Sequence, residues 1–102
     1  MATIALGDLL DDLRVADQGL RKFEQRYWLS SQVFYDLYSQ GVLDNGQHLE
    51  DFSEWAGHYK LKQDRERLFR EFSERRAAEL RAQSTDGYID LSPPEPVLEV
   101  TD

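Results

Sequence analysis

Apolar residues recur at steps of three and four near the start of the chain, and this spacing predicts an amphipathic helix. The helix is expected to begin near Leu6 and to end near Tyr27. Gly19 weakens it by about 1 kcal/mol relative to alanine. Its predicted apolar face consists of Leu6, Leu9, Leu10, Leu13, Ala16, Leu20, Phe23 and Tyr27.

A second, shorter helix is predicted from about residue 31 to residue 40. Ser30 is a suitable N-cap, because its hydroxyl can accept a hydrogen bond from a backbone N–H of the first turn. Leu29 and Phe34 have the spacing of a hydrophobic staple. Gly41 suits the left-handed conformation that often ends a helix. The second helix therefore carries both a start signal and a stop signal.

A third helix is predicted from about Gln47 to Ala82, with Asp44 or Asn45 as its cap. It opens with an apolar face, and then polar residues occupy most of its circumference; the face consists of Leu49, Phe52, Ala56 and Tyr59. At 1.5 Å per residue such a helix is about 54 Å long, which exceeds what two shorter helices can cover. It therefore either breaks near residues 57–62 or packs its far end on something else.

The composition changes at Gln83. The segment 82–102 has three prolines, five acidic residues and no basic residue, and such a composition disfavours independent folding. We expect an all-α fold with a helical domain over residues 1–82. The tail over residues 83–102 is expected to be extended or disordered without a partner.

Charge is distributed unevenly along the chain. Residues 1–59 carry four basic and ten acidic groups, and residues 60–81 carry eight basic and five acidic groups. The net charge of −8 argues against attraction of the whole chain to nucleic acid or to anionic lipid. A basic helix over residues 60–81 could contact phosphates, but its interleaved acidic residues favour an ordinary solvated face.

Several function classes lack the residues that they require. The chain has no cysteine, which excludes disulfides and thiolate metal sites. No apolar run approaches the roughly 20 residues that span a bilayer, and the N-terminus lacks the basic region of a signal peptide. We expect a cytoplasmic protein that has no contact with membranes.

The sequence offers little material for catalysis. His48, Asp51, Glu54 and His58 could in principle form a zinc-like site, but a solvated helix face and the preference for carboxylates near a helix N-terminus explain their spacing better. The HExxH pattern and a glycine-rich phosphate loop are both missing. We therefore expect no enzymatic activity, no metal and no cofactor.

Aromatic residues are concentrated between Phe23 and Tyr59. This segment holds both tryptophans, four of the five tyrosines and three of the five phenylalanines. Helical spacing assigns most of them to a core. An exposed remainder, such as Trp28 or Tyr35, is expected to anchor a partner protein.

Two further segments are candidates for contact with a partner. The tail alternates apolar and polar residues, and a segment of this kind can add as a strand to a partner's sheet edge. The alternative is a disordered tail that has no role. The apolar residues of the tail are Tyr88, Ile89, Leu91, Val97, Leu98 and Val100. The third helix offers a seam for a homodimer, formed by Leu61, Leu68, Phe69 and Phe72.

The segment from Leu20 to Lys62 resembles small bacterial antitoxin-like helical proteins that occur as the upstream partner in toxin–antitoxin-type gene pairs. The residues that carry the resemblance are Arg26-Tyr27, Leu29-Ser30-Ser31, Phe34-Tyr35, Tyr38, Gly41, Leu43, Asp51-Phe52, Glu54-Trp55-Ala56 and Tyr59. The resemblance implies a non-catalytic helical protein that binds and inhibits a partner, such as a small ribonuclease-like toxin.

The chain also departs from many antitoxins. Nothing in it resembles the basic N-terminal DNA-binding domain that many of them carry. Two alternatives therefore stay open beside the antitoxin-like function. One is a self-associating helical module, and the other is a nucleic-acid-binding regulator that uses residues 60–81.

Overall fold

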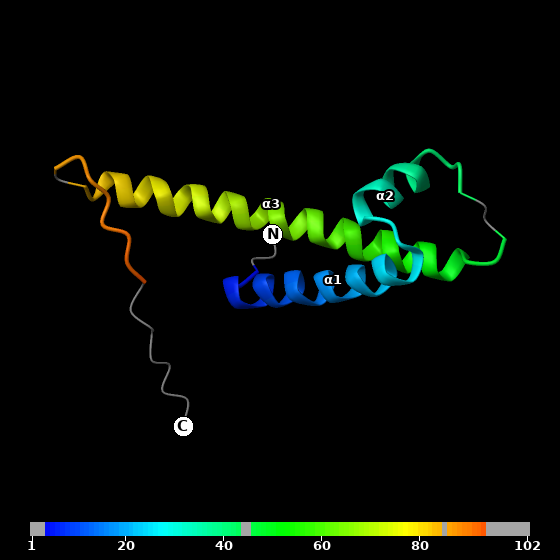
Figure 1. Cartoon of the computed structure of the whole chain (residues 1–102). Coiled ribbons are helices and arrows are strands. Elements are labelled where there is room, and N and C mark those ends of the chain that lie inside the picture. Colours follow the sequence, from blue (N-terminus) through cyan, green and yellow to red (C-terminus); the bar gives the residue numbers. More distant parts are fainter. Residues whose placement is uncertain (1–3, 44–45, 85, 94–102) are drawn as a thin grey trace, which may run out of the picture. The chain divides into compact units, whose positions relative to one another are not determined.

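The computed structural model describes residues 4–43, 46–84 and 86–93, and this part of the chain contains three α-helices and no strand. The helices are α1 (Leu6–Tyr27), α2 (Ser31–Ser39) and α3 (Leu49–Ala82) (Figure 1). The predicted all-α fold is confirmed, and each predicted helix boundary lies within two residues of the observed one. The predicted caps Asp44 and Asn45 lie outside the described residues.

The chain divides into two compact units, residues 1–71 and residues 72–102. Helix α3 contributes residues to both units and is one uninterrupted helix. The predicted break near Gly57–Lys62 is therefore not observed. The predicted division at residues 82 and 83 coincides with the end of α3 instead of with the boundary between the units.

Within the first unit, α1 and the first part of α3 lie side by side and antiparallel (Figure 1). Four ion pairs fix this arrangement, because their residue numbers rise along α1 as they fall along α3. The pairs are Asp12–Arg65 at 2.7 Å, Asp17–Lys62 at 2.9 Å, Lys22–Glu54 at 3.0 Å and Arg26–Asp51 at 2.7 Å. These charged pairs border the apolar strip of α1 that contains Leu9 and Ala16, which are both buried.

The hydrophobic core lies where all three helices meet, and Trp55 of α3 is its centre. The Trp55 ring stacks on Phe34 of α2, with 3.8 Å between ring centroids and 3° between ring planes. Phe23 and Tyr27 of α1 each stack on the same ring, at 5.6 Å between centroids. This packing confirms the prediction that most of the aromatic residues between Phe23 and Tyr59 lie in a core.

The predicted apolar faces of α1 and α3 are wider than the surfaces of these helices that neighbouring helices cover. Leu6, Leu10 and Leu49 belong to the predicted apolar faces, but they are 37%, 42% and 51% exposed. One neighbouring helix covers only a narrow strip of α1. The residues of α1 that this strip buries are Leu9, Ala16, Leu20 and Phe23.

The signals predicted for α2 are observed. The Ser30 hydroxyl accepts a hydrogen bond from the backbone N–H of Val33 at 3.2 Å, so Ser30 is the N-cap. Phe34 belongs to the core cluster, and Leu29 is partly buried and packs against that cluster. Gly41 follows the helix with φ of +70°, which is the left-handed conformation expected there.

In the second unit, residues 86–93 contain neither helix nor strand. Polar contacts connect this segment to the last turns of α3. The Ser84 hydroxyl donates to the Tyr88 carbonyl at 2.8 Å, and the Arg76 guanidinium donates to the Ser92 carbonyl at 3.3 Å. The absence of regular structure in these eight residues agrees with the predicted extended tail.

Candidate partner-binding surfaces

Trp28 is the most exposed large hydrophobic residue that the structure describes, at 91% of its surface. None of the ring contacts in the described residues involves its indole. The other tryptophan, Trp55, is 1% exposed. The two largest side chains of the first unit therefore have opposite environments, and only Trp28 is available to a partner.

The backbone of Trp28 is also unusual, with φ of 56° and ψ of 45°. Only three residues connect α1 to α2. The Trp28 N–H still donates to the Glu24 carbonyl at 2.9 Å, and the left-handed turn then lets Leu29 pack against the core and Ser30 cap α2. Glycine or asparagine usually occupies such a position, because the left-handed conformation costs other residues about 1–2 kcal/mol.

Tyr35, the second predicted anchor, lies in a different environment. It is partly buried and packs against the core cluster. Its ring lies 5.0 Å from the Tyr59 ring and 6.3 Å from the Tyr38 ring, measured between centroids. Tyr35 therefore has neighbours within the chain that Trp28 lacks.

The tail residues that the structure describes are exposed. Tyr88, Ile89 and Leu91 are 81%, 44% and 73% exposed within the second unit. The other predicted contact residues of the tail, Val97, Leu98 and Val100, lie outside the described residues. Three apolar side chains of the second unit are thus accessible to a partner.

The predicted dimer seam contains residues of two kinds. Leu61 and Leu68 are partly buried in the first unit. Phe69 in the first unit is 37% exposed, and Phe72 in the second unit is 36% exposed. Only the two phenylalanines keep a large accessible surface.

A buried polar network joins the three helices next to the core. The Trp55 indole N–H donates to the Ser31 hydroxyl at 2.8 Å, and that hydroxyl donates to the Glu24 carboxylate at 2.7 Å. The Ser31 backbone N–H and the Arg21 guanidinium donate to the same carboxylate at 3.0 and 2.8 Å. Burial disfavours the ionised form, but the hydrogen bonds from Ser31 and Arg21 outweigh it and hold the Glu24 pKa below its ordinary value.

The sequence did not reveal this network. Ser30 and Ser31 are adjacent, and the pattern identified only the capping function of the first serine. Ser31 is 4% exposed, and a serine at the start of a helix beside a buried aromatic face is the one signal that could have indicated a second role. The network connects all three helices.

The carboxylates considered as metal ligands are already engaged in other contacts. Asp51 accepts hydrogen bonds from the Tyr27 hydroxyl at 2.6 Å and from Arg26 at 2.7 Å, and these hold its pKa below the ordinary value. Glu54 pairs with Lys22. In residues 4–43, 46–84 and 86–93, no three histidine, aspartate or glutamate side chains come together as a metal site.

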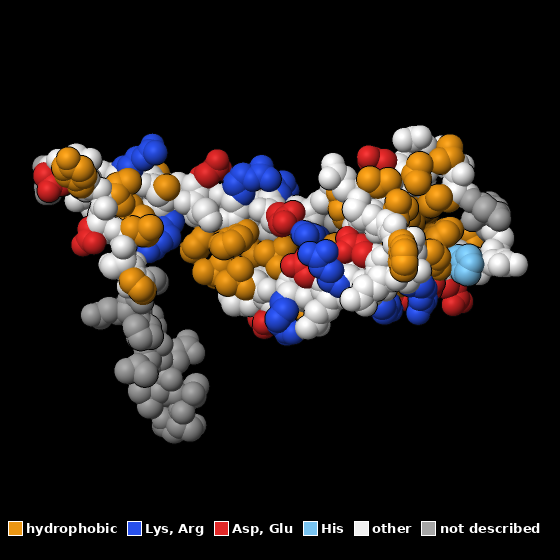
Figure 2. Space-filling view, in the orientation of Figure 1, with side chains coloured by type: hydrophobic (Ala, Val, Ile, Leu, Met, Phe, Trp, Pro, Cys, Tyr) orange, Lys and Arg blue, Asp and Glu red, His pale blue; other side chains and the backbone are white. Residues whose placement is uncertain are grey.

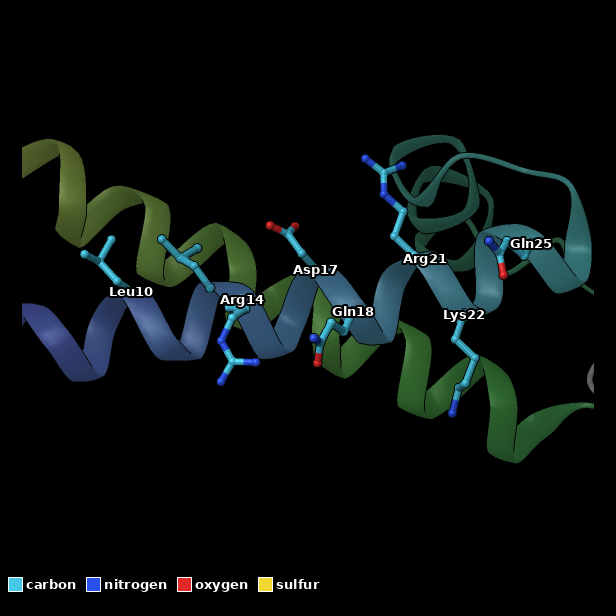
Figure 3. Close-up of a pocket in the computed structure, with 8 residues that line it drawn as sticks. Leu10, Arg14, Asp17, Gln18, Arg21, Lys22 and Gln25 are labelled. Carbon is cyan, nitrogen blue, oxygen red and sulfur yellow. The ribbon is translucent and has the colours of Figure 1, made fainter.

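Two hollows on the described surface of the first unit do not form an enclosed ligand site. One follows the surface of α1, and Figure 3 shows that its labelled lining residues, from Leu10 to Gln25, all belong to that helix. A surface formed by one helix has no opposite wall to hold a small molecule. The other is a cavity of about 340 Å³ beside Leu20, Ser31 and Tyr59. Its charged residues are Glu24, Lys62 and Glu66, and the first two pair with Arg21 and Asp17.

The basic residues of α3 alternate with acidic residues, as predicted. Arg65 pairs with Asp12 and Asp64, and Arg67 pairs with Asp64 and Glu71. Figure 2 shows basic and acidic side chains next to each other on the visible face. In the described part of the chain, no helix is long and apolar enough to cross a membrane.

Comparison of the chain with models of protein families, with curated proteins and with solved structures gives no match.

Proposed function

We propose that this chain is a non-enzymatic interaction protein of the bacterial cytoplasm that binds and inhibits a partner protein, as antitoxins do. The observation that carries the proposal is the Trp28 indole, which is 91% exposed and has no ring contact in the described residues. Exposed aromatic residues of this size are typical anchors of protein interfaces. The resemblance of residues 20–62 to antitoxin-like proteins supports the inhibitory role.

The tail supports the same proposal. Its apolar residues Tyr88, Ile89 and Leu91 are exposed, and its acidic composition suits a segment that becomes ordered on binding. A segment of this kind can add a strand to a sheet edge of the partner. The first unit would then position the chain, while the tail would extend the interface.

Co-expression with the product of the adjacent gene tests the proposal. We expect the full chain to retain that protein in a pull-down and to relieve the growth defect that the protein causes when expressed alone. A matched chain that ends at Gln83 separates the contribution of the tail. Failure of the full chain to retain the neighbouring protein would contradict the proposal.

Self-association is a second candidate function, and the exposed phenylalanines favour it. Phe69 and Phe72 are more than one third exposed, although buried phenylalanine side chains stabilise a fold by about 1.5–3 kcal/mol each. Light scattering of the full chain tests this candidate. A dimer that dissociates in the Phe69→Gln variant would support it, and a monomer at high concentration would contradict it.

A further inference from the structure

We propose that Trp28 is an anchor residue whose indole inserts into an apolar pocket on a basic partner protein, with a hydrogen-bond acceptor at the floor of that pocket. The inference rests on the proposed function, because the partner is the protein that the chain is proposed to inhibit. It adds the conformational argument for Trp28 as the contact residue and the chemistry of the surface that receives it.

The first step of the argument is conformational. The connection between α1 and α2 requires a left-handed residue, and glycine would adopt that conformation without a steric penalty. Trp28 adopts it instead, and its 91% exposed side chain gains almost no burial in return. A residue that adopts a costly conformation and leaves its side chain 91% exposed indicates a role outside the folded chain.

The second step concerns the indole itself. It combines a large apolar ring system with one N–H donor, and a buried indole usually finds an acceptor for that donor. Trp55 satisfies this requirement inside the core, where its N–H donates to Ser31 at 2.8 Å. We infer that the partner supplies Trp28 with an equivalent environment, namely apolar walls and one acceptor oxygen.

The third step concerns charge. The basic residues in the last turns of α1 are neutralised, since Arg21, Lys22 and Arg26 pair with Glu24, Glu54 and Asp51. The region before Trp28 therefore offers no unpaired cationic row for a phosphate backbone. The first unit, residues 1–71, carries four more acidic than basic groups, and this excess complements a basic protein surface.

The test compares binding with stability in the full chain. The Trp28→Gly variant is expected to weaken the Kd for the adjacent gene product about 30-fold or more in calorimetry, as the loss of a central tryptophan does. Trp28→Phe keeps apolar area but loses the N–H donor, so an intermediate loss is expected. Val15→Gln is the control, because Val15 is 47% exposed on the same helix and about 20 Å away along its axis.

The same variants test the conformational argument without a partner. Trp28→Ala and Trp28→Gly both remove the indole, but only glycine relieves the left-handed conformation. We expect the Tm of Trp28→Gly to exceed that of Trp28→Ala by about 4 °C or more, with unchanged helical circular dichroism. Equal Tm values for the two variants would overturn this part of the inference.

Each binding outcome distinguishes the inference from the function on which it rests. If Trp28→Gly binds the neighbouring protein as tightly as the natural chain, the anchor is elsewhere and the proposed function stands. If no chain binds that protein, both proposals are overturned. If the natural chain binds single-stranded oligonucleotides and Trp28→Gly does not, the indole stacks on bases. The proposal that it inserts into a pocket on a protein is then overturned.

Discussion

Ser31 shows how one side chain can serve two partners at the junction of three helices. Its hydroxyl accepts from the Trp55 indole and donates to the Glu24 carboxylate. The hydroxyl thereby satisfies a buried donor, and it also places Glu24 where the carboxylate accepts three hydrogen bonds. Ser30, which precedes it, serves a local purpose and caps α2.

The two adjacent serines are expected to differ in their effect on stability. Ser31→Ala leaves the Trp55 N–H buried without an acceptor, which is expected to lower the free energy of unfolding by about 1–3 kcal/mol. Ser30→Ala removes only the cap and is expected to lower it by about 1 kcal/mol. Urea unfolding followed by circular dichroism measures both. An equal or reversed order would contradict the role assigned to Ser31.

The lowered pKa of Glu24 predicts a loss of stability in acid. Between this native pKa and the ordinary value of 4.5, the unfolded chain binds more protons than the folded chain, so the free energy of unfolding rises with pH. The stabilisation is fully present above 4.5 and is lost as the pH falls through the native pKa. Glu24→Gln should therefore destabilise the chain at neutral pH, and urea unfolding at a series of pH values should show this difference shrinking in acid.

At the scale of the elements, Gly19 of α1 lies directly against the His58 side chain of α3. The Cβ of an alanine at this position would lie 2.6 Å from the Cδ2 and Nε2 atoms of His58. The His58 side chain is 25% exposed and lies 3.6 Å from the Glu54 carboxylate. The glycine thus makes room for a ring between the two helices, although its own helix would be more stable with alanine.

A double-mutant cycle tests this packing. In a His58→Ala background, Gly19→Ala should stabilise the chain by about 1 kcal/mol through helix propensity alone. In the natural chain the new methyl group must displace the His58 ring, so the gain should be smaller or become a loss. Thermal unfolding of the four chains measures the coupling. Additive effects would show that the ring moves away at no cost.

At the scale of the whole molecule, the buried residues that the structure describes all lie in the first unit. Every buried core residue in the described part of the chain lies between Leu9 and Ala56. Residues 72–82 of α3 form a helix that contains no buried residue. Isolated helices of about this length are marginal in water, so this part of α3 is expected to open more readily than the rest.

Truncation and hydrogen exchange test this difference between the units. A chain that ends at Glu71 should keep its Tm within about 4 °C of the full chain, because it retains the whole core. A control chain that ends at Gln63 loses Arg65, the partner of Asp12, and should unfold at a lower temperature. In the full chain, the amides of residues 72–82 should exchange faster than those of residues 52–60.

Much of the fold could be predicted from the sequence because its signals are local. Ser30 and Gly41 marked the ends of α2, and the spacing of apolar residues located α1 and α3. Helical spacing also placed Phe34 and Trp55 in the core. These predictions needed only neighbouring residues, which form caps and helix faces independently of the rest of the chain.

The remaining features depend on contacts between distant segments. From the sequence, Gly19 could be recognised only as a residue that weakens its helix. Its role in making room for the His58 ring depends on a residue 39 positions later in the chain. The exposure of Leu6 and Leu10 depends on how much of α1 is covered by α3. Trp28 was predicted as an exposed anchor, but its left-handed conformation follows from the path between two helices and has no signature in a tryptophan.

Because the two tryptophans have opposite environments, the tryptophan fluorescence of this chain can report on both binding and unfolding. Trp55 is enclosed by aromatic rings, whereas Trp28 faces solvent. A soluble quencher should therefore reduce the fluorescence of Trp28 first and reach Trp55 only after unfolding. A shielded Trp28 would signal an occupied interface, and a quenched Trp55 would signal an opened core, so one emission experiment can separate binding from folding.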